Sequence, residues 1–152
     1  MGDSMKNGIR FVAGLLAITA TLVADTKVKM EDLPAAVQQA VKEQIKSATL
    51  VGFSKEIENG KTTYEAETKV NGKSRDIEFD SKGAVLTIEE EVDLATIPAA
   101  VRTAIEQKAA GGTIKKVESV THGAAISYEA AIKTKAGKNI EIGVNADGSR
   151  HK

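Results

Sequence analysis

The sequence has no cysteine, no tryptophan, only two prolines and few aromatic residues. Without cysteine there is no disulfide, no thiolate nucleophile and no attachment point for an amino-terminal lipid on a cysteine. Aromatic residues make up 3% of the chain, which is too few for a surface on which nucleic-acid bases stack. We therefore expect the fold to be stabilised by packing alone.

The sequence also lacks a net charge, because 21 lysines and arginines are balanced by 21 aspartates and glutamates. A chain without a basic excess has no long-range field that attracts the phosphates of DNA or RNA. Nucleic acid is therefore not expected as a partner. Residues 25–91 are mildly acidic and residues 92–152 mildly basic, a difference that favours contact between the two halves.

One long apolar run is present, at residues 11–23, and it follows Lys6 and Arg10 and ends in small residues. This order is typical of a signal peptide, which we assign to residues 1–24. The run is shorter than the ~20 residues needed to cross a bilayer; a retained anchor or a buried helix is the alternative. The signal predicts an exported protein, periplasmic or secreted, with no membrane attachment after cleavage.

The chain contains an internal repeat. Residues 33–37 (LPAAV) are matched 64 positions later by residues 97–101 (IPAAV), and a Tyr-Glu-Ala motif recurs at the same spacing. This period is longer than that of the usual solenoid repeats. We therefore predict two copies of one small domain, at residues 25–91 and 92–152.

Each copy begins with a helical pattern and continues with strand patterns. Apolar residues recur at helical spacing in residues 33–47 and 97–110, and the alternation of strands follows each helix. Asn-Gly pairs at residues 59–60 and 71–72 are typical of hairpin turns. The predicted fold class is α+β, with two tandem repeats, each one helix packed on an antiparallel sheet of three to four strands. Domains of this size are marginal alone, so we expect the copies to pack together or to share a sheet.

The second copy stops short of a complete fourth strand, because only residues 149–152 follow its last turn. The first copy has a strand at residues 84–90 in the equivalent place. We expect the last strand, at residues 138–144, to have an open edge. A protein partner could pair with this edge, or a second copy could do so in an edge-strand dimer. The alternative is that the basic tail, or the strand at residues 84–90, covers it.

Alternation along the strands also places charged side chains together on the solvent face of the sheets. We predict a partner-binding surface formed by Glu65, Glu67, Lys69 and Glu78 in the first copy and by Glu129, Lys133 and Glu141 in the second. Asp76 belongs to the same face, and Lys69, Lys73 and Arg75 are expected nearby to neutralise this acidic patch. The alternative function is a small-molecule or calcium sensor that uses the acids of the first copy together with residues 89–91 and Asp93. For residues 89–91 we favour a solvated linker, because consecutive strand residues point to opposite faces.

No catalytic constellation accompanies these acids. His122 and His151 are the only histidines, and neither has the spacing of a metal-binding pair. The sequence has no Gly-x-Ser-x-Gly elbow. Tyr64 and Tyr128 could form a ligand clamp, but alternation predicts that both face the core. We therefore predict a protein that is not an enzyme, with no catalytic residue, no metal site and no cofactor, and with a protein partner.

Several of these segments resemble the PepSY domain. In the second copy they are residues 99–101 (AAV), 111–114 (GGTI), 127–130 (SYEA) and 145–148 (NADG). In the first copy, residues 32–37 (DLPAAV), 64–66 (YEA) and 79–83 (FDSKG) resemble the PepSY-like group related to the beta-lactamase inhibitory protein. The resemblance implies an exported bacterial α+β protein without a catalytic motif, of a group in which some members inhibit peptidases or other enzymes by binding them.

Overall fold

The computed structural model describes residues 26–151, which form eight strands, two α-helices and one short 3₁₀ helix. The strands are β1 (Thr26–Val28), β2 (Thr49–Glu58), β3 (Lys61–Val70), β4 (Lys73–Asp80), β5 (Val85–Glu91), β6 (Thr113–His122), β7 (Ala125–Lys133) and β8 (Asn139–Asn145). The helices are η1 (Met30–Asp32), α1 (Ala35–Gln44) and α2 (Ala99–Ala109). The signal peptide predicted at residues 1–24 lies outside the described residues.

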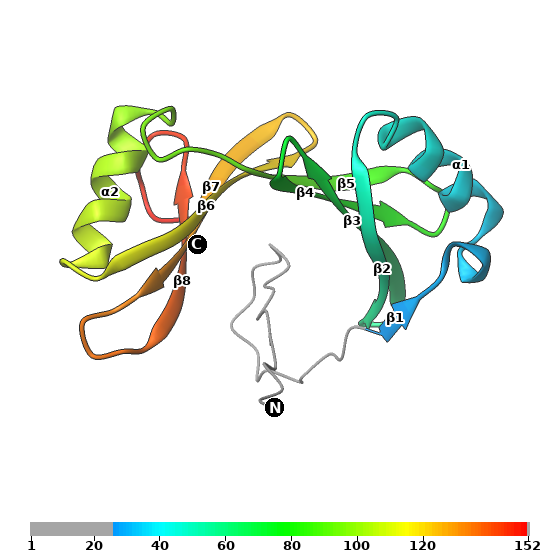
Figure 1. Ribbon diagram of the computed structural model, residues 1–152, viewed down its shortest axis with the longest axis horizontal. Helices are drawn as coiled ribbons and strands as arrows, with labels where there is room; N and C mark the ends of the chain where they lie inside the picture. Colours follow the sequence, from blue (N-terminus) through cyan, green and yellow to red (C-terminus); the bar gives the residue numbers. More distant parts are fainter. Residues whose placement is uncertain (1–25, 152) are drawn as a thin grey trace.

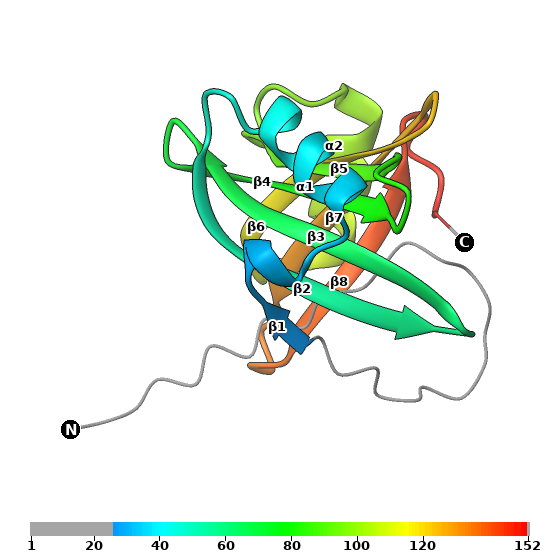
Figure 2. The same cartoon turned by 90° about the vertical axis from the view of Figure 1, so that its right-hand side faces the viewer.

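All eight strands belong to one antiparallel sheet, in which every strand lies beside its neighbours in sequence, in the order β1 to β8. The sheet curves like an arch, and α1 and α2 lie on its outer side near opposite ends (Figure 1). The view turned by 90° shows the long strands β2 and β3 crossing in front of the remainder of the sheet (Figure 2). The helices therefore cover only one of the two faces of the sheet.

The prediction of two tandem repeats, each a helix on its own small sheet, is wrong. The fourth strand of the first copy, β5, pairs directly with the first strand of the second copy, β6, from Thr87 opposite His122 to Glu91 opposite Glu118. Two separate sheets would leave the edges of β5 and β6 with unpaired backbone N–H and C=O groups. Pairing these edges satisfies both rows of groups, and the result is a single sheet across the chain.

Two hydrophobic clusters hold the helices against this sheet. Under α1, the fully buried side chains of Val37 and Val41 pack with apolar residues of β2, β3 and β4, among them Phe79. Under α2, Val101 and Ile105 pack with apolar residues of β6, β7 and β8. These pairs of residues are four apart along each helix, so they share one helical face. The helical spacing in the sequence therefore marked the buried faces correctly, although each helix is shorter than predicted.

Two glycines allow the helices to approach the sheet closely. A Cβ added to Gly83, before β5, would lie 2.6 Å from the carbonyl oxygen of Ala36 in α1. A Cβ added to Gly148, after β8, would lie 2.9 Å from the carbonyl oxygen of Ala100 in α2. Both glycines have positive φ angles, of +83° and +86°, a conformation that other residues adopt at a cost. The first turn of each helix thus packs against a glycine, and the two glycines occupy equivalent positions in the two copies of the repeat.

Tyr64 and Tyr128 face the helices, as alternation predicts. Each is partly buried and packs against the edge of one of the two clusters. Neither ring is placed to clamp a ligand together with the other, because the rings belong to separate clusters under separate helices. Both tyrosines are therefore structural residues at the margin of the core.

Candidate functional site

Within residues 26–151, one face of the sheet carries no helix (Figure 1), and we call it the helix-free face. Paired residues on adjacent strands point to the same face, and consecutive residues along a strand point to opposite faces. Phe53, Ala66 and Ile77 are paired in register and are buried under α1. The rows on either side of this core row therefore belong to the helix-free face.

Acidic residues dominate four neighbouring rows of the helix-free face. The carboxylates of these rows are Glu65, Glu67, Asp76, Glu78, Glu89, Glu91, Glu118, Glu129 and Glu141, and the basic residues are Lys69, Lys116 and His122. The chain as a whole has no net charge, so this excess of acids is a property of the face. Like charges placed directly opposite one another on adjacent strands are destabilising, as for Glu65 opposite Glu78.

All seven residues predicted for the binding surface lie on the helix-free face. In the first copy, Glu65 pairs with Glu78, and Glu67 pairs with Asp76. Lys69 ends the same face of β3 opposite Ser74. Because the two copies share one sheet, these residues and those of the second copy form one surface rather than two.

In the second copy, the structure brings two of the three predicted residues together. Glu129 on β7 and Glu141 on β8 interact through a hydrogen bond between their carboxyl groups. Lys133 is exposed at the end of β7, where it pairs with Asn139. It therefore lies outside the four acidic rows, at the margin of the surface.

The binding surface predicted from the sequence leaves out three acids at the centre of the helix-free face. Glu89, Glu91 and Glu118 lie on β5 and β6 at the junction between the copies. The prediction of a solvated linker at residues 89–91 is wrong, because β5 is paired on both of its sides. Alternation alone would place Glu89 and Glu91 on one face, but only the pairing of β5 with β6 brings Glu118 beside them.

Of the three basic residues expected to neutralise the acids, Lys69 lies on the helix-free face, but Lys73 and Arg75 lie on the other side of the sheet. The guanidinium of Arg75 faces the helices, where its Nε lies 2.9 Å from Oε1 of Glu90 and its Nη1 donates to the carbonyl oxygen of Gln44. Lys73 pairs with Asp93, with 2.7 Å between Nζ and Oδ2. The prediction that Lys73 and Arg75 neutralise the acids of the helix-free face is therefore wrong.

A network of hydrogen bonds fixes the acids at the junction of the copies. The backbone N–H of Ser74 donates to Oε2 of Glu91 over 3.1 Å, and its hydroxyl donates to the same oxygen and, over 3.4 Å, to Oε1 of Glu118. Nζ of Lys116 lies 2.8 Å from Oε1 of Glu118. Glu118 is 8% exposed, and a buried carboxylate is tolerated when it is paired in this way. Lys116 is thus already engaged with Glu118.

Glu129 differs from an ordinary surface glutamate. Burial, the largest cause, raises the pKa of its carboxyl group from 4.5 to about 8 together with the hydrogen bond to Glu141 and the negative charges of Glu89, Glu141 and Glu118. A carboxyl group with this pKa is protonated at neutral pH. Glu129 therefore donates a hydrogen bond to Glu141 instead of adding one more negative charge to the face.

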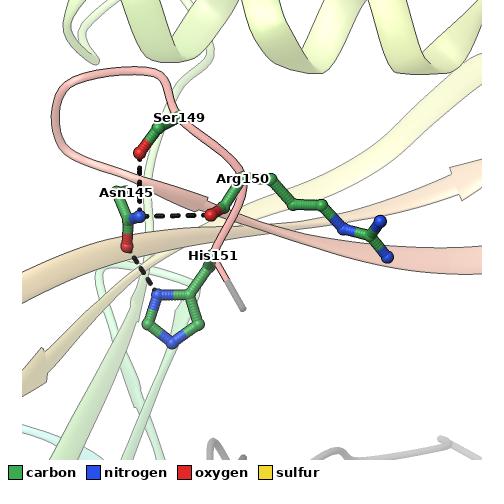
Figure 3. Close-up of a pocket in the computed structure, with 4 residues that line it drawn as sticks. All are labelled: Asn145, Ser149, Arg150 and His151. Atoms are coloured by element: carbon green, nitrogen blue, oxygen red, sulfur yellow. Dashed lines mark hydrogen bonds between the residues drawn. The ribbon is translucent and has the colours of Figure 1, made fainter.

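The carboxyl-terminal residues fold back over the end of β8. Arg150 forms a bridge with Val144, and the backbone N–H of His151 donates to the carbonyl oxygen of Gly143. Figure 3 shows Asn145 at the centre of this turn: its amide donates to Oγ of Ser149 and to the carbonyl oxygen of Arg150, and its Oδ1 lies 2.7 Å from Nδ1 of His151. The basic tail therefore covers this end of the edge, which is the alternative to the open edge that we predicted. In the described part of the chain, the remainder of β8 has no strand on its outer side.

The turn also lines a shallow surface pocket with Asn145, Ser149, Arg150 and His151 (Figure 3). The guanidinium of Arg150 extends away from the other three side chains. Their polar atoms are used in contacts with one another, so this pocket offers few free groups to a ligand. We therefore regard it as a structural turn.

The described residues give no support for the calcium alternative. No group of three or more histidine, aspartate or glutamate residues between 26 and 151 is arranged to hold a metal ion. The acids of the helix-free face are spread along rows and do not converge on one point.

Neither of the two α-helices is long and apolar enough to cross a membrane.

Comparisons with known proteins identify relatives by sequence and by fold. Residues 21–73 and 62–149 match the model of a family described as "Putative beta-lactamase-inhibitor-like, PepSY-like". No match was found among curated proteins.

Solved structures with a similar fold come from several Bacteroides species. A "putative periplasmic" protein from Bacteroides eggerthii is 18% identical, with a TM-score of 0.65 over 79% of this chain and 86% of that chain. A DUF2874 family protein from Bacteroides uniformis is 20% identical, with a TM-score of 0.64 over 78% of this chain and 86% of that one. A BLIP-like protein from Bacteroides fragilis is 20% identical, with a TM-score of 0.57 over 78% and 84%. At these identities the likeness shows a common fold.

Proposed function

Because the chain belongs to the PepSY-like, beta-lactamase-inhibitor-like family, we propose that it is an exported, non-catalytic protein that binds a protein partner on the helix-free face of its sheet. Its effect on that partner would be inhibition or modulation, in keeping with the family description. The partner would be another periplasmic or secreted protein. The same proposal includes a signal peptide at residues 1–24 and two sequence repeats, at residues 25–91 and 92–152.

The acidic surface of the helix-free face is the observation that supports this proposal most strongly. The outer face of the sheet is used by the two helices, whose apolar residues pack against it. Within residues 26–151 no helix lies over the helix-free face, and every strand from β3 to β8 contributes at least one carboxylate to it. A broad, curved and preformed surface suits the binding of a protein better than that of a small ligand, which prefers a concave apolar pocket.

The same surface favours binding over catalysis. General acid and base catalysis requires groups that converge on a substrate in a partly closed site. The carboxylates of this face lie in rows on adjacent strands and interact with neighbouring residues of the sheet, as Glu118 does with Lys116 and Ser74. Such a row can match the charges of a partner along its length.

Site-specific photo-crosslinking in the producing cell tests the proposed function. A photoreactive amino acid would replace Glu67 or Glu141 on the helix-free face and, as matched controls, Glu43 or Glu106 on the exposed sides of α1 and α2. We expect crosslinks to one protein from the first pair and none to that protein from the second. The captured protein would then be purified and its affinity for the unmodified chain measured.

Crosslinks from Glu43 and Glu106 alone would contradict the use of the helix-free face. Failure of the purified partner to bind the chain would contradict the function itself. Measurement of the activity of the partner, with and without the chain, would then distinguish inhibition from simple binding.

A further inference from the structure

The edge strand β8 has a sequence that reads nearly the same in both directions. Residues 139–145 (NIEIGVN) are centred on Ile142, with asparagine at both ends and a β-branched apolar residue next to each asparagine. Two copies of this strand can lie antiparallel about a two-fold axis at Ile142. The pairs that result are Asn139 with Asn145, Ile140 with Val144, and Glu141 with Gly143. No like charges come opposite one another, so the strand is complementary to a second copy of itself.

The side of β8 that faces α2 carries only apolar side chains. Ile142 and Val144 belong to the cluster under α2, whereas Ile140 is 37% exposed. α2 crosses the sheet obliquely, because its first turn packs on Gly148 after β8 and the turn that follows it approaches the carbonyl oxygen of Lys133 at the end of β7. The helix therefore leaves the edge around Ile140 uncovered. In the two-fold arrangement, Val144 of the second copy would cover this side chain.

The tail at residues 149–151 occupies one end of this edge. The N–H of Asn145 donates to the tail over 2.8 Å, and the C=O of Gly143 accepts a hydrogen bond from it over 3.1 Å. Backbone groups on one side of a strand recur at every second residue, so those of Asn139 and Glu141 point to the same side. No strand within residues 26–151 pairs with them there. The tail thus covers half of an edge whose other half is free.

β8 carries two residues that fit the tail to this edge. A Cβ added to Gly143 would lie 2.9 Å from Cβ of His151, and a glycine within a strand often marks the close approach of another backbone. The side chain of Asn145 binds the tail at three points (Figure 3). The backbone groups of Gly143 and Asn145 that hold the tail are also those that a second β8 would use. The tail and a second β8 therefore exclude one another.

We infer that the edge of β8 is a docking site for β8 of a second copy of this chain, and that the tail blocks it. With the tail in place, the chain is a monomer whose edge is protected, as edges of sheets usually are. With the tail released, two β8 strands pair antiparallel about Ile142 and join two sheets into one. This inference goes beyond the proposed function, because the pairing uses the edge of the sheet and leaves the helix-free face accessible.

The near-symmetry of β8 selects a second copy over an unrelated strand. An unrelated strand would gain the backbone hydrogen bonds alone, whereas β8 of a second copy also matches the side chains of the edge. A two-fold pair uses both β8 edges, so association ends at a dimer. Both tails must open before two copies pair. If the tail is open in about one molecule in ten, the affinity of the copies for one another falls about a hundredfold.

Gly143→Ala in the full chain tests the inference, because the added methyl group displaces His151 and changes nothing else in the length or charge of the chain. The matched control is Gly52→Ala in β2, where an added Cβ meets nothing within 4 Å. Sedimentation equilibrium measures the dissociation constant of the dimer. We expect Gly143→Ala to dimerise about a hundredfold more tightly than the wild type, and Gly52→Ala to behave as the wild type does. Melting curves verify folding, and deletion of residues 149–152 replaces Gly143→Ala if that variant is unfolded.

Single cysteines added to Gly143→Ala test the register, because the chain has no cysteine of its own. Ile142→Cys places one cysteine of each copy across the two-fold axis, at a Cα separation of about 4.5 to 5.5 Å that a disulfide can bridge. Ile140→Cys places them four residues apart along the strands, about 13 Å, which is beyond the reach of a disulfide. We expect oxidation to link two copies through residue 142 and not through residue 140.

Monomers in the wild type and in every variant would overturn the inference, and so would a dimer that is equally tight in all of them. A disulfide through residue 140 in place of residue 142 would refute the two-fold pairing about Ile142. A disulfide from residue 142 to another protein of the producing cell, without a dimer of the chain, would assign the edge to that protein and refute the second copy as its occupant.

Discussion

Replacement of Glu129 by glutamine gives a prediction whose magnitude follows from the structure. In the unfolded chain Glu129 titrates near 4.5, and in the folded protein its pKa is about 8. The folded state therefore binds its proton more tightly than the unfolded state. Stability from this group is fully present below pH 4.5, is lost progressively as the pH rises from 4.5 to 8, and stays at its lower value above pH 8.

The size of this loss follows from the pKa difference. One pKa unit corresponds to about 1.4 kcal/mol. The full shift sets an upper limit, and water around the partly exposed carboxyl group, together with the sharing of the proton with Glu141, reduces the effect. We expect ionisation of Glu129 to destabilise the folded protein by an amount on the order of 3 kcal/mol. Glutamine keeps the shape of the protonated side chain and cannot ionise.

Urea denaturation of the wild type, Glu129→Gln and the surface control Glu106→Gln at pH 5, 7 and 9 measures the effect. At pH 5 the free energies of unfolding of wild type and Glu129→Gln should agree closely. At pH 9 the Glu129→Gln variant should be more stable than the wild type by roughly 3 kcal/mol, while Glu106→Gln should follow the wild type throughout. Equal pH slopes for wild type and Glu129→Gln would refute the reasoning, as would a variant less stable than wild type at pH 9.

Three further changes test the packing that supports the face. Gly148→Ala should destabilise the protein by about 2 to 3 kcal/mol, because the added methyl group meets the first turn of α2. The control Gly60→Ala, whose added Cβ meets nothing within 4 Å, should cost about 1 kcal/mol. Equal melting temperatures of the two variants would show that the close contact between Gly148 and α2 is unimportant. Tyr128→Ala should cost about 2 kcal/mol for its partly buried ring, and an unchanged melting curve would tell against its place at the core. Asn145→Ala should cost about 1 kcal/mol and speed hydrogen exchange at the amide of His151; unchanged exchange would mean that the tail is held by other contacts.

Local features of the fold could be predicted from the sequence, because they depend on residues close in the chain. Helical spacing located α1 and α2, and alternation assigned Glu65, Glu67 and Glu78 to one face. These assignments need no knowledge of which strand lies beside which. Alternation also assigns Arg75 to the face opposite Asp76. The wrong prediction that Arg75 neutralises the acids could therefore have been avoided from the sequence.

The pairing of β5 with β6 could not be predicted in the same way. These strands are separated in sequence by α2, and a repeat suggests two similar units without saying how their edges meet. Only that pairing brings Glu118 beside Glu91 and makes one sheet of the two copies. The unusual pKa of Glu129 was also out of reach, because it arises chiefly from burial and from neighbours on three other strands.

The pairing of the two copies also explains how a chain without net charge presents an acidic surface. The repeat places acids on the same face in each copy, and the shared sheet adds these faces together. Fewer basic residues lie on this face, and two of those close to the acids in sequence, Arg75 and Lys73, lie on the opposite side of β4. Composition alone could not reveal this separation of charge between the two faces.

Charge reversal measured on a purified complex tests the central claim most directly. Glu67→Lys with Glu141→Lys would be compared with Glu43→Lys with Glu106→Lys, which carries the same change in net charge on the helices. We predict that the first variant loses affinity for the captured partner at least a hundredfold, while the second binds within about threefold of wild type. Equal affinities of the two variants would contradict binding on the helix-free face.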